Sequence, residues 1–127
     1  MRVISLRPLR EFWGRAVAPA RSEQLLRAWY DHTEGATWRN FGELRQTFGS
    51  ADVVGDCVVF EVGNNRIRLI GRVRCANAKG RGLVYVLAVL THAEYDDNKW
   101  PDDCGCHKKP KPKGGPRPTK AKPRKKK

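Results

Sequence analysis

An unbroken apolar run from Leu83 to Leu90, with the sequence LVYVLAVL, constrains the fold of this chain more than any other feature. Its three valines and its tyrosine favour a β-strand over a helix in so short a run. Because no polar residue alternates with the apolar ones, we expect both faces of the strand to be covered, in the interior of a sheet that packs against helices. The run ends abruptly at the polar sequence THAEYD, from Thr91 to Asp96.

The polar residues that follow this strand fit two interpretations. An imidazole, a phenol and carboxylates at the end of a buried strand are well suited to proton transfer. Polar residues at strand ends are also common without any chemistry, and here they can simply cap the strand and begin a short helix. Both interpretations agree with the sequence alone.

Hydrophobic spacing in the rest of the chain predicts an α+β fold. A short strand at 2–5 precedes three predicted helices, at 6–15, at 22–33 and between Asn40 and Gly49. The large aromatic residues of these helices are expected to lie in the core rather than to stack on bases. The N-terminal helices should pack on one face of a small, mostly antiparallel sheet and leave its other face partly open.

A β-hairpin is predicted next, with its turn at Gly63-Asn64-Asn65. Its second arm carries arginines at alternate positions, interrupted by Ile70, and a period of two places them on one face of the strand. These arginines are Arg66, Arg68, Arg72 and Arg74. Such a row can bind successive phosphates through bidentate guanidinium groups. It can equally be a solvated face whose arginines pair with Glu61 and other acids.

The positive charge of the chain is concentrated at its C-terminus. Eleven of the 26 basic residues lie between Lys108 and Lys127, where no acid occurs, so the rest of the chain carries 15 basic against 13 acidic residues. The net charge of +13 is therefore no evidence of a uniformly basic folded surface. From Pro101 onward we expect a disordered tail, because proline, glycine and lysine predominate. Such a tail can add non-specific affinity for RNA, or it can serve solubility or localisation.

Cysteine and hydropathy patterns indicate a reducing, cytoplasmic setting. Cys57 and Cys75 fall in predicted strands and are expected to be reduced core residues. The CGCH sequence at 104–107 offers soft metal ligands, but without a second half-site we favour a flexible end that carries two thiols. No apolar run reaches the ~18 residues of a membrane span, and the N-terminus is too polar for a signal peptide. No metal ion or other cofactor is expected.

A family resemblance extends from Met1 to about Cys104 and is most specific in the block THAEYD. The main segments that carry it are RVIS at 2–5, LREFW at 9–13, AWY at 28–30, FGSADVV at 48–54, RLI at 68–70, VYV at 84–86, THAEYD at 91–96 and KW at 99–100. With these segments the chain resembles the HigB-type toxins of bacterial type II toxin–antitoxin modules, a branch of the RelE-like ribonuclease group. The resemblance implies a toxin domain at 1–104, followed by a basic tail at 105–127 that lies outside it.

The resemblance also implies an activity and a set of functional residues. Members of this family cleave mRNA, usually on translating ribosomes, by metal-independent attack of a 2′-OH, and a helix-turn-helix HigA-type antitoxin neutralises them. The positions that carry over as catalytic are His92, Tyr95, Arg68 and Arg72. Those that we expect to contact RNA are Arg66, Arg74, Asn65 and Lys99. In this scheme the histidine is general acid or base, the tyrosine donates to or holds the 2′-OH, and the arginines clamp the phosphate. Asp96 orients the histidine or caps its helix.

Two positions depart from the family pattern. Glu61 stands where members usually have Asn, and Leu87 stands where they usually have a basic residue inside the central strand. The loss of a cation weakens a phosphate site. The alternative to an active toxin is therefore a decayed one, which binds RNA or the ribosome without cleavage. A structural interaction domain with a basic tail is a further, weaker alternative.

Overall fold

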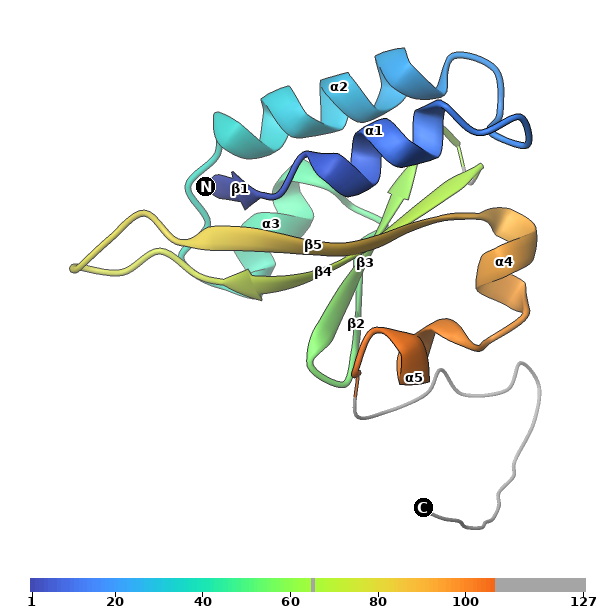
Figure 1. Cartoon of the computed structure of the whole chain (residues 1–127). Helices are drawn as coiled ribbons and strands as arrows, with labels where there is room; N and C mark the ends of the chain where they lie inside the picture. Colours follow the sequence, from blue (N-terminus) through green and yellow to red (C-terminus); the bar gives the residue numbers. More distant parts are fainter. Residues whose placement is uncertain (65, 107–127) are drawn as a thin grey trace, which may run out of the picture.

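A single five-stranded sheet forms the centre of the fold in the computed structural model, which describes residues 1–64 and 66–106 (Figure 1). The strands, in spatial order, are β1 (Arg2–Ile4), β5 (Leu83–Thr91), β4 (Ile67–Arg74), β3 (Cys57–Val62) and β2 (Asp52–Val54). Only the β1–β5 pair is parallel among these strand pairs. The predicted α+β fold with a mostly antiparallel sheet is confirmed.

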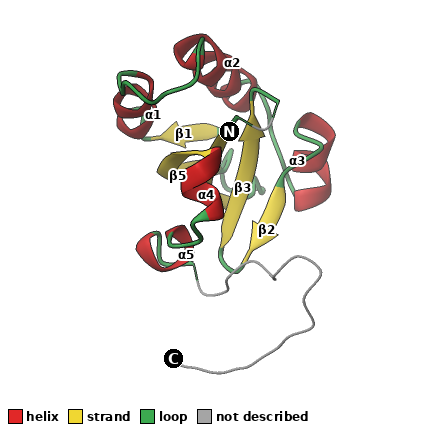
Figure 2. Ribbon diagram, turned by 90° about the vertical axis from the view of Figure 1, so that its right-hand side faces the viewer, coloured by secondary structure: helices red, strands yellow, loops and turns green. Residues whose placement is uncertain are grey.

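Three helices build the core on one face of this sheet. They are α1 (Arg7–Trp13), α2 (Ser22–Glu34) and α3 (Phe41–Thr47) (Figures 1 and 2). The third begins where the sequence predicts, because the Asn40 side chain accepts a hydrogen bond from the Glu43 N–H at 2.9 Å. No helix in the described part of the chain is both long and apolar enough to cross a membrane.

An aromatic cluster fills the core between these helices and the sheet. The ring of Phe60, which is fully buried, lies 5.3 Å from Trp29 and 5.5 Å from Phe48, and both contacts are edge-to-face. Trp38 stacks on the same Phe60 ring at 6.4 Å. Trp29 of α2 is only 2% exposed, as is Trp38 in the loop before α3, and both are core residues as the sequence predicts.

Helix α5 (Trp100–Asp103) lies on the other side of the sheet from α1 and α2 (Figure 2). A second apolar cluster packs beneath it. Trp100 and Cys106 are 3% and 7% exposed, and they pack with Ile70 and Val59. The sequence predicts disorder from Pro101 onward, and this prediction is wrong for residues 101–106. Their apolar side chains bury enough surface to fix the segment. The predicted disorder of the remaining tail, 107–127, lies outside the described residues.

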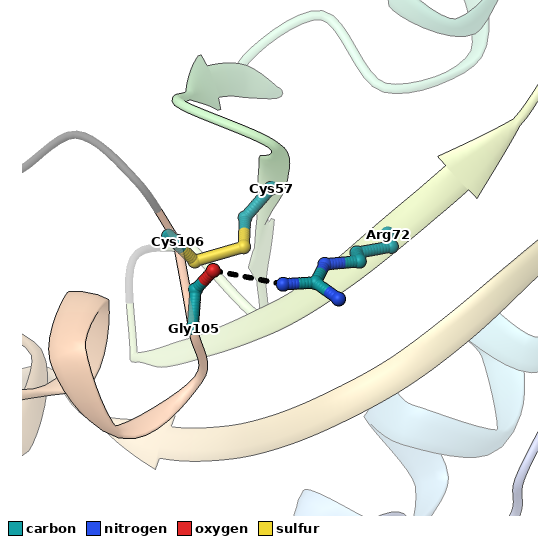
Figure 3. Close-up of a disulfide and its surroundings, with 4 residues drawn as sticks. All are labelled: Cys57, Arg72, Gly105 and Cys106. Carbon is teal, nitrogen blue, oxygen red and sulfur yellow. Dashed lines mark hydrogen bonds between the residues drawn. A yellow bond between two sulfur atoms is a disulfide. The ribbon is translucent and has the colours of Figure 1, made fainter.

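A disulfide between Cys57 and Cys106 ties this segment to the start of β3 (Figure 3). The two Cα atoms are 5.7 Å apart, within the usual span of such a bond. The expectation of a reduced Cys57 is wrong, since its partner is a residue assigned to a flexible end. Cys75 and Cys104 are unpaired.

Replacement of Cys57 by serine should destabilise the protein by about 2–4 kcal/mol, because the bond constrains a long loop in the unfolded chain. The closed loop spans a sequence separation of 49 residues. Denaturant unfolding of the oxidised protein measures the difference, and Cys75→Ser is the matched control, expected to change stability by at most about 0.5 kcal/mol. Equal stability of the wild type with and without a reducing agent would contradict the prediction.

Strand β5 lies in the interior of the sheet, as the sequence predicts, but its two faces differ. Val84, Val86 and Val89 are buried against the helices, whereas Tyr85 on the opposite face is 50% exposed. The expectation that both faces are covered therefore fails at Tyr85, because α5 packs only against the later part of the strand, from Leu87 onward.

A β-bulge interrupts the pairing of β5 with β4. The partner of Ile70 is Ala88, but the partner of Gly71 is Val86, so Leu87 is the extra residue. Glycine suits this position because a Cβ at residue 71 would lie 3.1 Å from the Tyr85 carbonyl oxygen.

Candidate functional site

Helix α4 (His92–Asp96) begins directly at the end of β5 and presents the predicted acid–base residues. Thr91 and Glu94 form a capping box: the Thr91 Oγ1 accepts from the Glu94 N–H at 3.1 Å, and the Glu94 carboxylate accepts from the Thr91 N–H at 3.0 Å. These polar residues do cap a short helix, as one interpretation holds. The same cap places His92 and Tyr95 three residues apart on one helical face, so capping and chemistry are compatible.

A salt bridge anchors α4 to the segment after α1. The guanidinium of Arg15 donates to both carboxylate oxygens of Glu94, at 2.7 and 3.1 Å. This hydrogen bond, more than the Thr91 cap, holds the pKa of Glu94 below its usual value. Because the lowered pKa favours the charged form in the folded state, Glu94 stabilises the fold above the unfolded carboxyl pKa of about 4.3. That stabilisation is lost as the pH falls through the lower pKa of the folded protein.

Replacement of Glu94 by glutamine keeps an acceptor for the helix cap but removes the charge, so it should cost less than about 1 kcal/mol at neutral pH, and the cost should shrink under acid conditions. The ion pair itself adds little, since both side chains are 39% exposed. Denaturant unfolding at a series of pH values measures the effect. Glu23→Gln, which breaks the exposed pair with Arg27 at 2.8 Å, is the control. A loss of stability that does not change with pH would contradict the assignment.

The imidazole of His92 is half-exposed and lies against a carboxylate. Its Nε2 is 3.2 Å from Asp96 Oδ2, one helical turn later. This contact fits the predicted orienting role of Asp96. When Nε2 carries the proton of the neutral ring, Nδ1 keeps a lone pair that can accept a proton.

The ring of Tyr95 is held between an aromatic residue and a cation. It stacks on Trp100 at 5.3 Å with an interplanar angle of 17°, and the Arg68 guanidinium carbon lies 5.0 Å from its centroid. Burial raises the pKa of the Tyr95 hydroxyl, and the positive charge of Arg68 offsets this only in part. The phenol is therefore protonated at neutral pH and suited to donate a proton or a hydrogen bond.

Arg68 is buried beneath this helix rather than exposed in a row. Its side chain is 10% exposed, and its Nη2 lies 3.6 Å from Glu61 Oε2. For this residue, pairing with Glu61 is the interpretation that the structure favours. Its Nη1 is buried and has no hydrogen-bond partner among the described residues.

The remaining predicted site residues, catalytic Arg72 among them, lie apart from Tyr95. Arg72, four residues along β4, donates to the Gly105 carbonyl oxygen at 2.8 Å (Figure 3). Arg66 and Arg74 are exposed at opposite ends of β4, and Lys99 pairs with Asp97 at 3.5 Å. Asn65 lies outside the described residues. The structure thus brings Arg68 to Tyr95 and separates the remaining arginines from them.

Two neighbours of the site were not predicted from the sequence. Trp100 stacks on Tyr95, and its helix begins with a tryptophan-proline pair, a recognisable start signal. Arg15 lies 79 residues before Glu94, and no local pattern connects them.

The described residues do not form a metal centre. Within 1–64 and 66–106, no three His, Cys, Asp or Glu side chains come close enough to hold an ion. The predicted pair of free thiols does not exist, because Cys106 is in the disulfide. Burial raises the pKa of the remaining Cys104 thiol, which disfavours the thiolate that binds metals. His107 lies outside the described residues.

The fold and site define a small α+β protein whose polar side chains gather where its interior strand passes into a short helix. Residues 22–98 match the HigB toxin family, described as the RelE-like toxic component of a toxin–antitoxin system. The match runs from the first residue of α2 to just past α4 and includes β5 and the whole THAEYD block. The chain belongs to this family. No curated protein matches the chain.

Proposed function

We propose that this toxin is an endoribonuclease that cleaves mRNA by attack of a 2′-OH on the adjacent phosphate. The observation that carries the proposal is the arrangement at α4. A protonated Tyr95 phenol lies beside the buried Arg68 cation, and an exposed imidazole that an acid orients precedes it on the same helix. Membership of a toxin family supports the same conclusion.

The proposed reaction needs a base, an acid and positive charge. His92 takes the proton of the 2′-OH as the O2′–P bond forms, and the P–O5′ bond then breaks. Tyr95 protonates the leaving 5′-oxygen, which yields a 2′,3′-cyclic phosphate and a 5′-OH end. General acid–base groups contribute roughly 10²–10⁴-fold. Arg68 lies beneath the phenol, and its side chain is only 10% exposed. From this position it supplies positive charge that stabilises the phosphorane.

Partners follow from the family and from the proposed reaction. A toxin of a toxin–antitoxin system has an antitoxin, and we propose a helix-turn-helix protein of the HigA type. We propose mRNA on the ribosome as the substrate and the cytoplasm as the location. Neither RNA cleavage nor ribosome binding requires a cofactor in this scheme.

A non-catalytic RNA-binding protein is the second candidate, and one contact favours it. Glu61, which replaces the usual Asn, lies 3.6 Å from Arg68 and opposes the charge of the cation nearest Tyr95. Leu87 replaces a further cation in β5. Both differences weaken the stabilisation of a dianionic phosphorane.

Cleavage of defined mRNA by the full-length protein, with ribosomes and, separately, without ribosomes in the presence of EDTA, separates the two candidates. We expect cuts that leave 2′,3′-cyclic phosphates, and none with the antitoxin added. Preparations of the His92→Ala protein control for contaminating nucleases. If the wild type does not cut but a Glu61→Asn, Leu87→Arg double variant does, the protein is a decayed toxin. Equal cutting by wild type and His92→Ala would contradict the proposed site.

A further inference from the structure

A basic groove with one exposed aromatic ring lies on the second face of the sheet, away from α4. Its volume is about 410 Å³, and its lining residues are Arg72, Val73, Arg74, Leu83, Tyr85 and Leu87. The groove lies at the early part of β5, where Tyr85 is exposed beyond the apolar cluster under α5.

Tyr85 forms a fixed platform in this groove. Its strand is paired on both sides, with Ile4 opposite Tyr85 on β1 and Arg72 opposite it on β4. The side chain is 50% exposed, and no other aromatic ring of the described residues stacks on it. An aromatic face on a rigid backbone, open to solvent, can accept a nucleobase.

The charge of the groove complements a nucleic-acid backbone. Two arginines and no acid line it. Within the described residues neither Arg72 nor Arg74 takes part in an ion pair, and Arg72 donates to a neutral carbonyl oxygen. Their positive charge is thus available to phosphates.

The groove is linked to the candidate catalytic helix along β5. Leu87 lines both this groove and a second one of about 270 Å³ between α1 and β5. The second groove reaches Arg15, the residue that holds Glu94 of α4. From Tyr85 to His92 the path covers roughly 20 Å at the rise of a β-strand.

We propose that single-stranded RNA flanking the cleaved phosphate lies along β5, with one base stacked on Tyr85 and adjacent phosphates bound by Arg72 and Arg74. This inference rests on the proposed ribonuclease function and assigns its flanking subsite. Leu87, the bulged residue at the middle of the path, contacts the strand without charge. The family pattern leads one to expect one basic residue at position 87, and in this chain the charge of the groove comes from Arg72 and Arg74 on β4.

Binding of full-length protein to an uncleavable 2′-O-methyl RNA of about 12 nucleotides tests the subsite. The comparison ligand is an abasic strand of equal length, which keeps the phosphates but offers no base. Tyr85→Ala should weaken binding of the RNA roughly 5- to 100-fold and leave the abasic strand unaffected. Tyr85→Phe keeps the ring and should bind as the wild type does. Arg74→Gln should weaken both ligands and reduce the salt slope by about 0.7.

Val53→Ala is the matched control, since Val53 is also 50% exposed on the sheet but lies on β2. Equal affinity of wild type and Tyr85→Ala for the base-containing strand would overturn the subsite. The subsite would also be overturned if Tyr85→Ala weakened binding of the antitoxin but not of RNA, because the groove would then bind a protein. The assay needs no cleavage, so its result is independent of the proposed ribonuclease function. Tyr85-dependent binding by a protein that does not cut RNA would contradict that function and leave the RNA subsite supported.

Discussion

We expect the His92→Ala protein to cleave RNA roughly 10²–10⁴-fold more slowly than the wild type, and its expression to stop arresting growth. The alanine removes the one imidazole of α4, and with it the group that accepts the 2′-OH proton. Folding should be unaffected, because the side chain is 49% exposed and pairs with Asp96 of the same helix. Single-turnover cleavage of a defined mRNA measures the effect.

The chain offers a matched control for this substitution. His32 is another exposed histidine on a helix, with its Nδ1 2.8 Å from the Ala28 carbonyl oxygen. His32→Ala should cleave as the wild type does. Asp96→Asn, which keeps the geometry but loses the charge beside His92, should give an intermediate loss. Wild-type cleavage by a folded His92→Ala protein would remove this residue from the mechanism.

Replacement of Phe60 by alanine should destabilise the protein by about 3–5 kcal/mol. The residue is fully buried, and its ring contacts three other aromatic rings, those of Trp29, Trp38 and Phe48. Its removal leaves a cavity that rigid indole and phenyl groups cannot fill by small shifts. Because β3 also carries Cys57 and Glu61, we expect the loss to loosen the support of the candidate site.

Denaturant unfolding, followed by tryptophan fluorescence, measures this loss. Val53→Ala, on an exposed part of β2, should change the unfolding free energy by at most about 0.5 kcal/mol. Phe60→Leu retains apolar volume and should cost less than Phe60→Ala. If the Phe60→Ala protein were as stable as the wild type, the aromatic cluster would not be the principal core of the fold.

The fold followed from local patterns to a large extent. The run from Leu83 to Leu90 predicts an interior strand, and Asn40 predicts the start of α3, because a strand pattern and a helix cap are both encoded within a few residues. The block THAEYD likewise encodes its own helix start, so the spacing of His92 and Tyr95 on α4 was predictable from the sequence.

Only the tertiary structure decided which distant residues meet and which side chains are covered. The sequence identifies a period-two row of arginines, but not that Tyr95, on which Trp100 stacks, covers Arg68 while Tyr85 and Arg74 stay open. It contains Cys57 and Cys106 without their pairing across 49 residues. The physical reason is that backbone periodicity fixes the face on which a side chain lies. What covers that face depends on contacts between segments far apart in the chain.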